Sequence, residues 1–347
     1  MTTLTQNQLI KYIPIAMKAN IVPFITGQPG AGKSSIVKRV AEEWNMHLID
    51  LRLSQLLPYD LLGLISPNTE KSKASYLPLN TFILEGDEIP NGKKGVILFL
   101  DEFNSADKST MAAAYKLILD RQVGQHKLHP NTRIICAGNR IKDNAIVNRI
   151  GTAMQTRLVH IELDSNNKDF IEYASREKWN PMLLGYFHFR PEMINTYNPN
   201  QADEVNTFAT NRTWEFLANQ LPLLLNQGDK DLLIAAVCGT IGDKAGSDFC
   251  SYLDLFDKIP TLEEILSNPN KCRIPNDSDI GSKWAICSFL ADKYSDDNVE
   301  AILTYTLRLD EPDLIVMALR TAINYYPKLI QNKQVQTFLQ EASALMA

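Results

Sequence analysis

The sequence predicts an α/β fold in the first half of the chain, with a five-stranded parallel sheet flanked by helices, followed by an all-helical region. Short apolar runs alternate with helical patterns as far as residue 163, which is typical of parallel strands joined by crossover helices. A glycine-rich octapeptide at residues 27–34 separates the first of these strands from the first of these helices. From residue 164 onward the chain reads as helices broken by polar or Pro- and Asn-rich turns.

The five predicted strands are nearly continuous in apolar residues, as strands buried on both faces should be. They are residues 22–26, 47–53, 96–101, 133–137 and 158–163. Helices fill the intervals, notably residues 34–44 and 108–121. In the second of these, apolar side chains recur on one face. The change of pattern near Asp164 and a softer one near Gly228 predict three domains: residues 1–163, 164–228 and 229–347. We expect an α/β domain, then a smaller helical domain and a helical C-terminal extension.

Composition argues against several classes of protein. The 347 residues are 45% apolar and 22% charged, as in ordinary globular proteins. A net charge of −5 gives no general attraction to nucleic acid or anionic membrane. The five cysteines are scattered, which fits small buried side chains in a reducing compartment. No apolar stretch approaches the ~20 residues that a membrane span needs. We therefore expect a cytoplasmic protein without a membrane span.

The octapeptide Gly-Gln-Pro-Gly-Ala-Gly-Lys-Ser fits the phosphate-binding pattern GxxxxGK[ST]. A triphosphate is wrapped by converging backbone N–H groups, which requires residues that turn tightly without a Cβ. Lys33 would reach the β- and γ-phosphates of ATP, and the Ser34 hydroxyl would bind Mg²⁺. The helix that follows would point its positive N-terminal end at the phosphates. The predicted nucleotide-binding residues here are Gly27, Gln28, Pro29, Gly30, Ala31, Gly32, Lys33, Ser34 and Ser35.

Two adjacent carboxylates end the predicted strand at 96–101. We expect Asp101 to support Mg²⁺ and Glu102 to orient and polarise the attacking water, since a divalent cation offsets the repulsion between the two groups. The next strand ends at Gly138 and Asn139, and the Asn139 amide is a candidate sensor of the γ-phosphate or the water. The alternative for Asn139 is a turn residue, because asparagine tolerates left-handed backbone geometry.

Several motifs in order resemble the MoxR and dynein-related branch of the AAA+ ATPases. They are Leu-Leu-Pro-Tyr-Asp-Leu-Leu-Gly at 56–63, Asp-Glu-Phe-Asn-Ser-Ala at 101–106, Arg-Gln-Val-Gly at 121–124 and Ile-Ile-Cys-Ala-Gly-Asn at 134–139. The resemblance covers residues 21–163, with weaker support to 221. It implies an ASCE-type P-loop NTPase fold, a loop inserted into the second helix, and a hairpin before the sensor strand. Ser105 departs from the pattern, because many members carry Arg there.

The resemblance also implies arginines that act on the phosphates. AAA+ proteins donate one from the neighbouring subunit, at the end of the helix before the fifth strand, and Arg157 occupies that position. Arg149 and then Arg140 are the alternatives. A second sensor is expected near the start of a lid helix, where Thr210 would be the N-cap and Arg212 would lie in the first turn. An inter-subunit arginine implies a ring, most simply a hexamer.

The motifs predict Mg²⁺-dependent ATP hydrolysis coupled to conformational work, but they leave its target open. The first interpretation is a MoxR-like, chaperone-like remodeller of a protein client, acting with a von Willebrand factor A-type partner. The alternative is a McrB-like motor on nucleic acid, which the acidic balance disfavours. A further alternative is a scaffold that binds ATP to assemble and rarely hydrolyses it.

Overall fold

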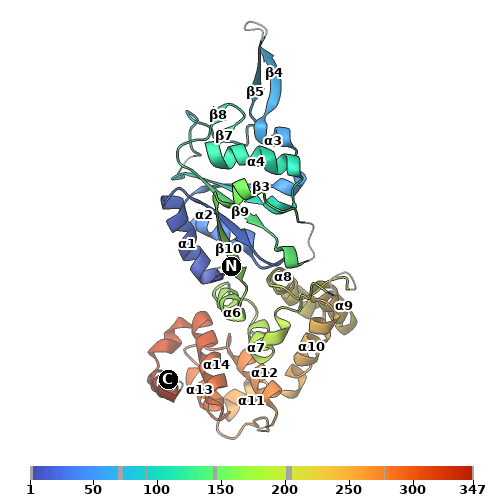
Figure 1. Ribbon diagram of the computed structural model, residues 1–347. Helices are drawn as coiled ribbons and strands as arrows, with labels where there is room; N and C mark the ends of the chain where they lie inside the picture. The colour runs from blue at the N-terminus through green and yellow to red at the C-terminus, as the bar shows by residue number, and fades with distance from the viewer. Residues whose placement is uncertain are drawn as a thin grey trace. The chain divides into compact units, whose positions relative to one another are not determined.

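The computed structural model describes residues 3–68, 73–90, 92–143, 147–200, 205–276 and 278–345. It divides the chain into two compact units, Met1–Asn166 and Asn167–Ala347, which are coloured in sequence order in Figure 1. Within these described ranges, no helix combines the length and the apolar character needed to cross a membrane. The division into domains at 1–163, 164–228 and 229–347 stays a proposal.

The first unit is built on a parallel sheet. In spatial order its strands are β1 (Thr3–Thr5), β10 (Leu158–Asp164), β2 (Val22–Thr26), β9 (Thr132–Gly138), β6 (Val96–Asp101) and β3 (His47–Arg52). Every neighbouring pair is parallel. All five predicted strands are present, but the prediction of five was incomplete, since the described residues add β1 at the edge. β9 lies between β2 and β6, so the loops that follow these three strands meet at one edge of the sheet.

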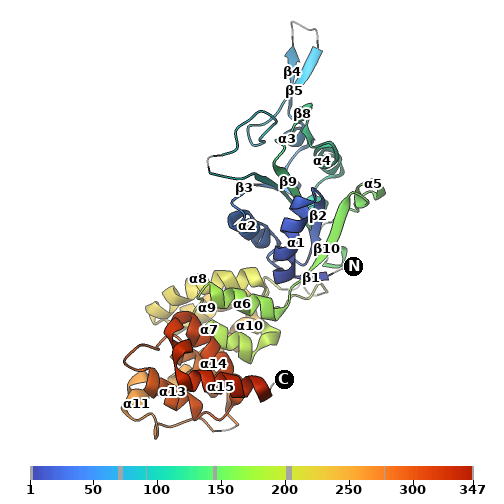
Figure 2. The same cartoon turned by 90° about the vertical axis from the view of Figure 1, so that its left-hand side faces the viewer.

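Helices cover both faces of this sheet (Figures 1 and 2). α1 (Gln6–Lys18) and α2 (Lys33–Glu43) pack on Ile97 and Phe99 of β6. α4 (Lys108–Asp120) packs on Leu98 and Leu100 of the same strand, because successive side chains point to opposite faces. These four strand residues are at most 1% exposed, and burying each side chain contributes roughly 1.5–3 kcal/mol. The layers thereby fix the strand ends that carry the site.

Two short hairpins extend the first unit. β4 (Leu64–Asn68) and β5 (Lys73–Leu77) follow the short helix α3 (Pro58–Leu62) and pair antiparallel. β7 (Gln122–Val123) and β8 (His126–Lys127) form the hairpin expected before the sensor strand. The two hairpins meet at Gly124. A Cβ at this position would lie 2.4 Å from the carbonyl oxygen of Leu62 and 2.7 Å from the Cβ of Tyr76 in β5, so only glycine fits there. In both views β4 and β5 project away from the sheet.

The second unit contains helices and no strand among its described residues, as predicted. Its helices are α6 (Asn167–Arg176), α7 (Pro181–Phe189), α8 (Asn211–Gln227), α9 (Lys230–Ile241), α10 (Asp243–Leu253), α11 (Leu262–Ser267), α12 (Ile280–Leu290), α13 (Val299–Leu307), α14 (Pro312–Tyr325) and α15 (Lys333–Leu345). Aromatic rings from three of them, Phe187, Trp214 and Phe249, pack edge to face. One hydrophobic cluster contains buried residues from α6 at the start of the unit to Val335 of α15.

Candidate nucleotide-binding site

The glycine-rich loop joins β2 to α2. Gly30 and Gly32 have φ angles of 73° and 88°, in the left-handed region that favours glycine, and Gly32 directly precedes the helix. The N-cap residue of α2, Gly32, makes no side-chain hydrogen bond to the helix, and the N-terminus of a helix is a place where N–H groups can bind an anion. Gln28 and Pro29 are partly buried in the loop, whereas Ser35 is exposed in the first turn of the helix.

Lys33 connects this loop to the end of β9. Its side chain is almost buried, with 8% exposed. The ammonium donates hydrogen bonds to the carbonyl oxygens of Gly27 (2.9 Å) and Gln28 (3.0 Å). It also lies 3.3 Å from Oδ1 of Asn139, 106 residues further along the chain. The structure therefore brings together the predicted phosphate-binding lysine and the predicted sensor amide.

Ser34 and Asp101 meet at the ends of α2 and β6. The Ser34 hydroxyl donates a 2.6 Å hydrogen bond to Oδ2 of Asp101, whose Oδ1 accepts from the main-chain N–H of Glu102 at 2.8 Å. Nowhere in the described part of the chain do three His, Cys, Asp or Glu side chains form a group that could hold a metal. Mg²⁺ usually binds through one or two protein oxygens together with substrate phosphates and water, and the Ser34 hydroxyl and the Asp101 carboxylate are oxygens of this kind.

Glu102 follows directly and is held in an uncommon conformation. Its φ of 54° lies in the left-handed region, which costs a non-glycine residue of order 1 kcal/mol. Its carboxylate accepts a hydrogen bond from the hydroxyl of Ser54, which lies in the turn after β3. Asp50 lies on β3, next to β6. Its pKa is raised, mainly by burial and then by the nearby charge of Asp101. Negative charge thus accumulates at this edge, where a cation would relieve it.

Two residues that hold the site were missed at the sequence level. The contact between Ser54 and Glu102 leaves no pattern in the sequence, because the two residues lie 48 positions apart and Ser54 belongs to no recognised motif. Asn104 lies inside a recognised motif, but nothing in the pattern predicts that its amide contacts the main chain of Asn139.

The three candidate arginines have different surroundings. Arg140 pairs with its own chain: Nε lies 2.7 Å from Oδ2 of Asp143, and Nη1 lies 3.0 Å from Oε1 of Glu162. Arg149 is exposed, as is Arg157, which follows the short helix α5 (Thr152–Gln155). The Arg140 guanidinium is therefore paired with carboxylates of its own chain. Arg149 and Arg157 are exposed and have no such ion pair in the described part of the chain, although Nη1 of Arg157 donates a 2.5 Å hydrogen bond to the carbonyl of Ala153.

Arg212 lies in the second unit. Thr210 is the N-cap of α8 and accepts a hydrogen bond from the N–H of Thr213, as the sequence predicts. Arg212 is exposed in the first turn of that helix. A cation there is disfavoured by the helix dipole unless an anion is near, and the sensor role of Arg212 stays a prediction.

A match to a protein family supports part of this assignment. Residues 23–158 match the ATPase family associated with various cellular activities (AAA). Similar solved structures include a mutant of RuvB from Thermotoga maritima (15% identity, covering 93% of this chain and 78% of that chain, TM-score 0.36). They also include NtrX from Brucella abortus in complex with ATP (15% identity, covering 100% and 67%, TM-score 0.38). A search of curated proteins found no match. The family match over residues 23–158 indicates an ATPase domain of AAA type in an α/β fold, and the chain is an ATPase.

Proposed function

We propose that the chain forms a ring in which Mg²⁺-dependent ATP hydrolysis drives remodelling or assembly of a protein client, in the manner of MoxR-type proteins. The observation that carries the proposal is the meeting of three strand ends. Lys33 lies 3.3 Å from Asn139, and Ser34 lies 2.6 Å from Asp101. These contacts join the phosphate loop to both strands whose ends carry the candidate catalytic groups.

Each residue has a distinct task in this proposal. Lys33 and the N–H groups of the loop bind the phosphates, and Ser34 and Asp101 hold Mg²⁺, which offsets phosphate charge when bound. Glu102 orients the attacking water and accepts its proton. Asn139, whose amide already lies beside Lys33, bonds the γ-phosphate or the water. Arg212 would make the position of the second unit depend on the nucleotide.

The proposal of a ring rests on an arginine that would act at the ATP site of a neighbouring subunit. An arginine that reaches the γ-phosphate accelerates phosphoryl transfer by roughly 10³–10⁵-fold. Arg157 is exposed at the end of α5, and this position supports a role at the site of the next subunit. Arg149 is the alternative. A hexamer is the assembly that the family resemblance favours.

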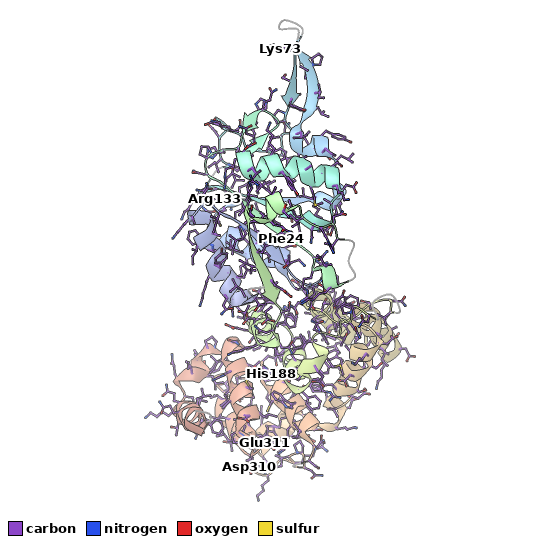
Figure 3. All side chains as sticks on the ribbon, viewed as in Figure 1. Phe24, Lys73, Arg133, His188, Asp310 and Glu311 are labelled. Carbon is purple, nitrogen blue, oxygen red and sulfur yellow. The ribbon has the colours of Figure 1, made fainter. Side chains whose placement is uncertain are left out.

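The β4–β5 hairpin supports a protein client rather than a nucleic acid. Leu64, Ile65 and Leu77 are 52%, 70% and 61% exposed, and such side chains contact other apolar groups. These residues lie at the base of the hairpin, where Leu64 pairs with Leu77, whereas Lys73, labelled in Figure 3, pairs with Asn68 at its far end. The net charge of −5 gives no general attraction to phosphate backbones. We therefore expect a protein client. A von Willebrand factor A-type partner is what the resemblance to MoxR proteins implies, and we propose that both act in the cytoplasm.

ATP turnover with and without DNA tests this proposal. Purified wild-type protein should hydrolyse ATP only with Mg²⁺, and neither single- nor double-stranded DNA should raise the rate. Stimulation by DNA that falls steeply with salt would assign the motor to nucleic acid instead. ATP-dependent assembly without sustained turnover would favour the scaffold alternative. Absence of ATP binding in any assembly state would remove the proposal.

A further inference from the structure

Asn104 lies between the strand ends that form the site. It is two residues after Glu102, in the turn Phe103–Ser105, and only 4% of it is exposed. Its side-chain nitrogen donates to the main-chain carbonyl of Asn139 at 2.8 Å. Its side-chain oxygen accepts from the main-chain N–H of the same residue at 3.0 Å. A single amide therefore pairs both backbone groups of Asn139, as a neighbouring strand would.

Gly138, the last residue of β9, makes this approach feasible. A Cβ at this position would lie 2.1 Å from Oδ1 and 2.8 Å from Cγ of Asn104. Both distances are too short for any side chain, so the glycine and the asparagine fit each other. The nearest further atom is Cε2 of Phe24, at 3.0 Å.

The main chain of Asn104 is bonded on its other side. Its carbonyl accepts a 2.6 Å hydrogen bond from the N–H of Asn148, and the Asn148 side chain donates to the carbonyl of Ala106 at 2.9 Å. Asn148 directly precedes Arg149 and leads to Arg157. The turn after Glu102 is thus attached both to the sensor position and to the segment that carries the exposed arginines.

We propose that Asn104 is a positioning residue for ATP hydrolysis, which keeps Asn139 and the segment 147–157 in a fixed arrangement relative to Glu102. The proposal rests on the proposed function, because it assigns Asn104 to that site. Asn104 itself need not touch nucleotide. Without its amide, the partly buried N–H and carbonyl of Asn139 would lose their partners, and the sensor side chain would no longer be held beside Lys33. A displacement of about 1 Å costs roughly 10²-fold in rate.

Asn104→Ala tests the proposal against a matched control, Thr110→Val. Thr110 is fully buried nearby, and its hydroxyl donates a 2.9 Å hydrogen bond to the carbonyl of Leu56, so the control also removes a buried polar contact. We expect Asn104→Ala to lower kcat by at least about tenfold while the Kd for ATP changes less than about threefold. Thr110→Val should leave kcat within about twofold of wild type, whatever its effect on the melting temperature. Equal kcat in Asn104→Ala and wild type would overturn the proposal.

Gly138→Ala approaches the same contact from the opposite side. Its Cβ would displace the Asn104 amide, so we expect the same loss of kcat. Because both changes break one contact, the double variant should be little worse than either single variant. Losses that multiply in the double variant would mean that the two residues act independently, against the proposal. Should Asn104→Ala not fold, Gly138→Ala and Asn104→Ser provide the measurement.

Amide hydrogen exchange separates this inference from the proposed function. In protein without nucleotide, Asn104→Ala should speed exchange at the main-chain N–H of both Asn139 and Asn148, and Thr110→Val should not. If wild type has no ATPase activity, the proposed function fails and exchange alone decides whether Asn104 holds these segments. Unchanged exchange at both positions would sink the inference whatever the activity.

Discussion

The ammonium of Lys33 lies 3.3 Å from the side-chain oxygen of Asn139, although 106 residues separate them. The contact exists because β9 is inserted between β2 and β6, which places its end beside the phosphate loop. Lys33 also bonds the carbonyl oxygens of Gly27 and Gln28. The lysine that should meet the phosphates is therefore already positioned by its own loop and by the sensor strand.

Replacing Lys33 with alanine should abolish ATP binding in the usable concentration range. The variant loses the charge that faces the phosphates and the hydrogen bonds that shape the loop. We expect the Kd for ATP to rise roughly a hundredfold or more, about 2.7 kcal/mol. Isothermal titration calorimetry measures it. Lys38→Ala, an exposed position on the same helix, is the control and should bind ATP like wild type. Equal affinity in Lys33→Ala and Lys38→Ala would contradict the assignment.

Glu102→Gln should separate binding from hydrolysis. The amide cannot accept the proton of the attacking water, so kcat should fall roughly 10²–10⁴-fold. ATP binding should persist, because Lys33, Ser34 and the loop are unchanged. Phosphate release and ATP titration on the same sample provide both numbers. Glu42→Gln, exposed on α2, should leave both unchanged. Undiminished turnover in Glu102→Gln would remove the proposed mechanism.

The phosphate loop and the acidic pair could be predicted because their chemistry requires particular residues at fixed spacing. The paired strands could be predicted because each is long enough to show an apolar pattern. β1 could not, since its three residues, Thr3–Thr5, gain strand geometry only by pairing with β10. The contact between Ser54 and Glu102 is equally invisible, because it depends on how the turn after β3 meets the end of β6.

Arg140 illustrates the same limit for charged residues. Its side chain suits a phosphate as well as a carboxylate, and the sequence alone keeps both options open. Only the fold places Glu162 of β10 beside it and buries the Asp143 side chain to 1% exposure. Partner choice in such cases is set by tertiary structure, which a local pattern does not contain.

Arg140→Ala should therefore lower stability more than catalysis. Asp143 would lose two hydrogen bonds from the guanidinium, at 2.7 and 2.8 Å, in a buried position. We expect a loss of about 2–3 kcal/mol and a fall in Tm of roughly 4–8 °C by calorimetry. Lys142→Ala is the control, because Lys142 is 66% exposed and its pair with Glu162 is worth at most about 1 kcal/mol. Normal stability with lost turnover in Arg140→Ala would return Arg140 to the list of phosphate-binding arginines.

Arg157→Ala should lose turnover while keeping ATP binding and assembly. If the arginine serves the neighbouring subunit, mixing this variant with Lys33→Ala should restore part of the activity. In mixed rings some interfaces combine an intact phosphate loop from one subunit with an intact arginine from the other. Turnover across mixing ratios measures this, and Arg149→Ala in the same mixture is the comparison. If Arg157→Ala keeps normal turnover, and mixing with Lys33→Ala restores the activity of Arg149→Ala, the role belongs to Arg149 instead.

Acidification should destabilise the second unit through His188. Burial lowers the pKa of this imidazole, labelled in Figure 3, from 6.5 to about 4. Its ring stacks on that of Trp284, with 5.7 Å between the ring centroids. The unfolded chain takes up the proton as pH falls below 6.5, whereas the folded state resists it until about 4. The free energy of unfolding should therefore be complete above pH 6.5 and fall below it, by up to about 1.4 kcal/mol per pH unit.

His188→Phe tests this assignment, because it keeps a stacked ring and removes the titration. Urea unfolding at pH 7, 6 and 5, followed by tryptophan fluorescence, should show a flatter pH dependence in the variant than in wild type. His126→Gln, on the exposed β7–β8 hairpin, should keep the wild-type slope. If the slopes of His188→Phe and wild type coincide between pH 7 and 5, the proton uptake that destabilises this unit occurs at other groups.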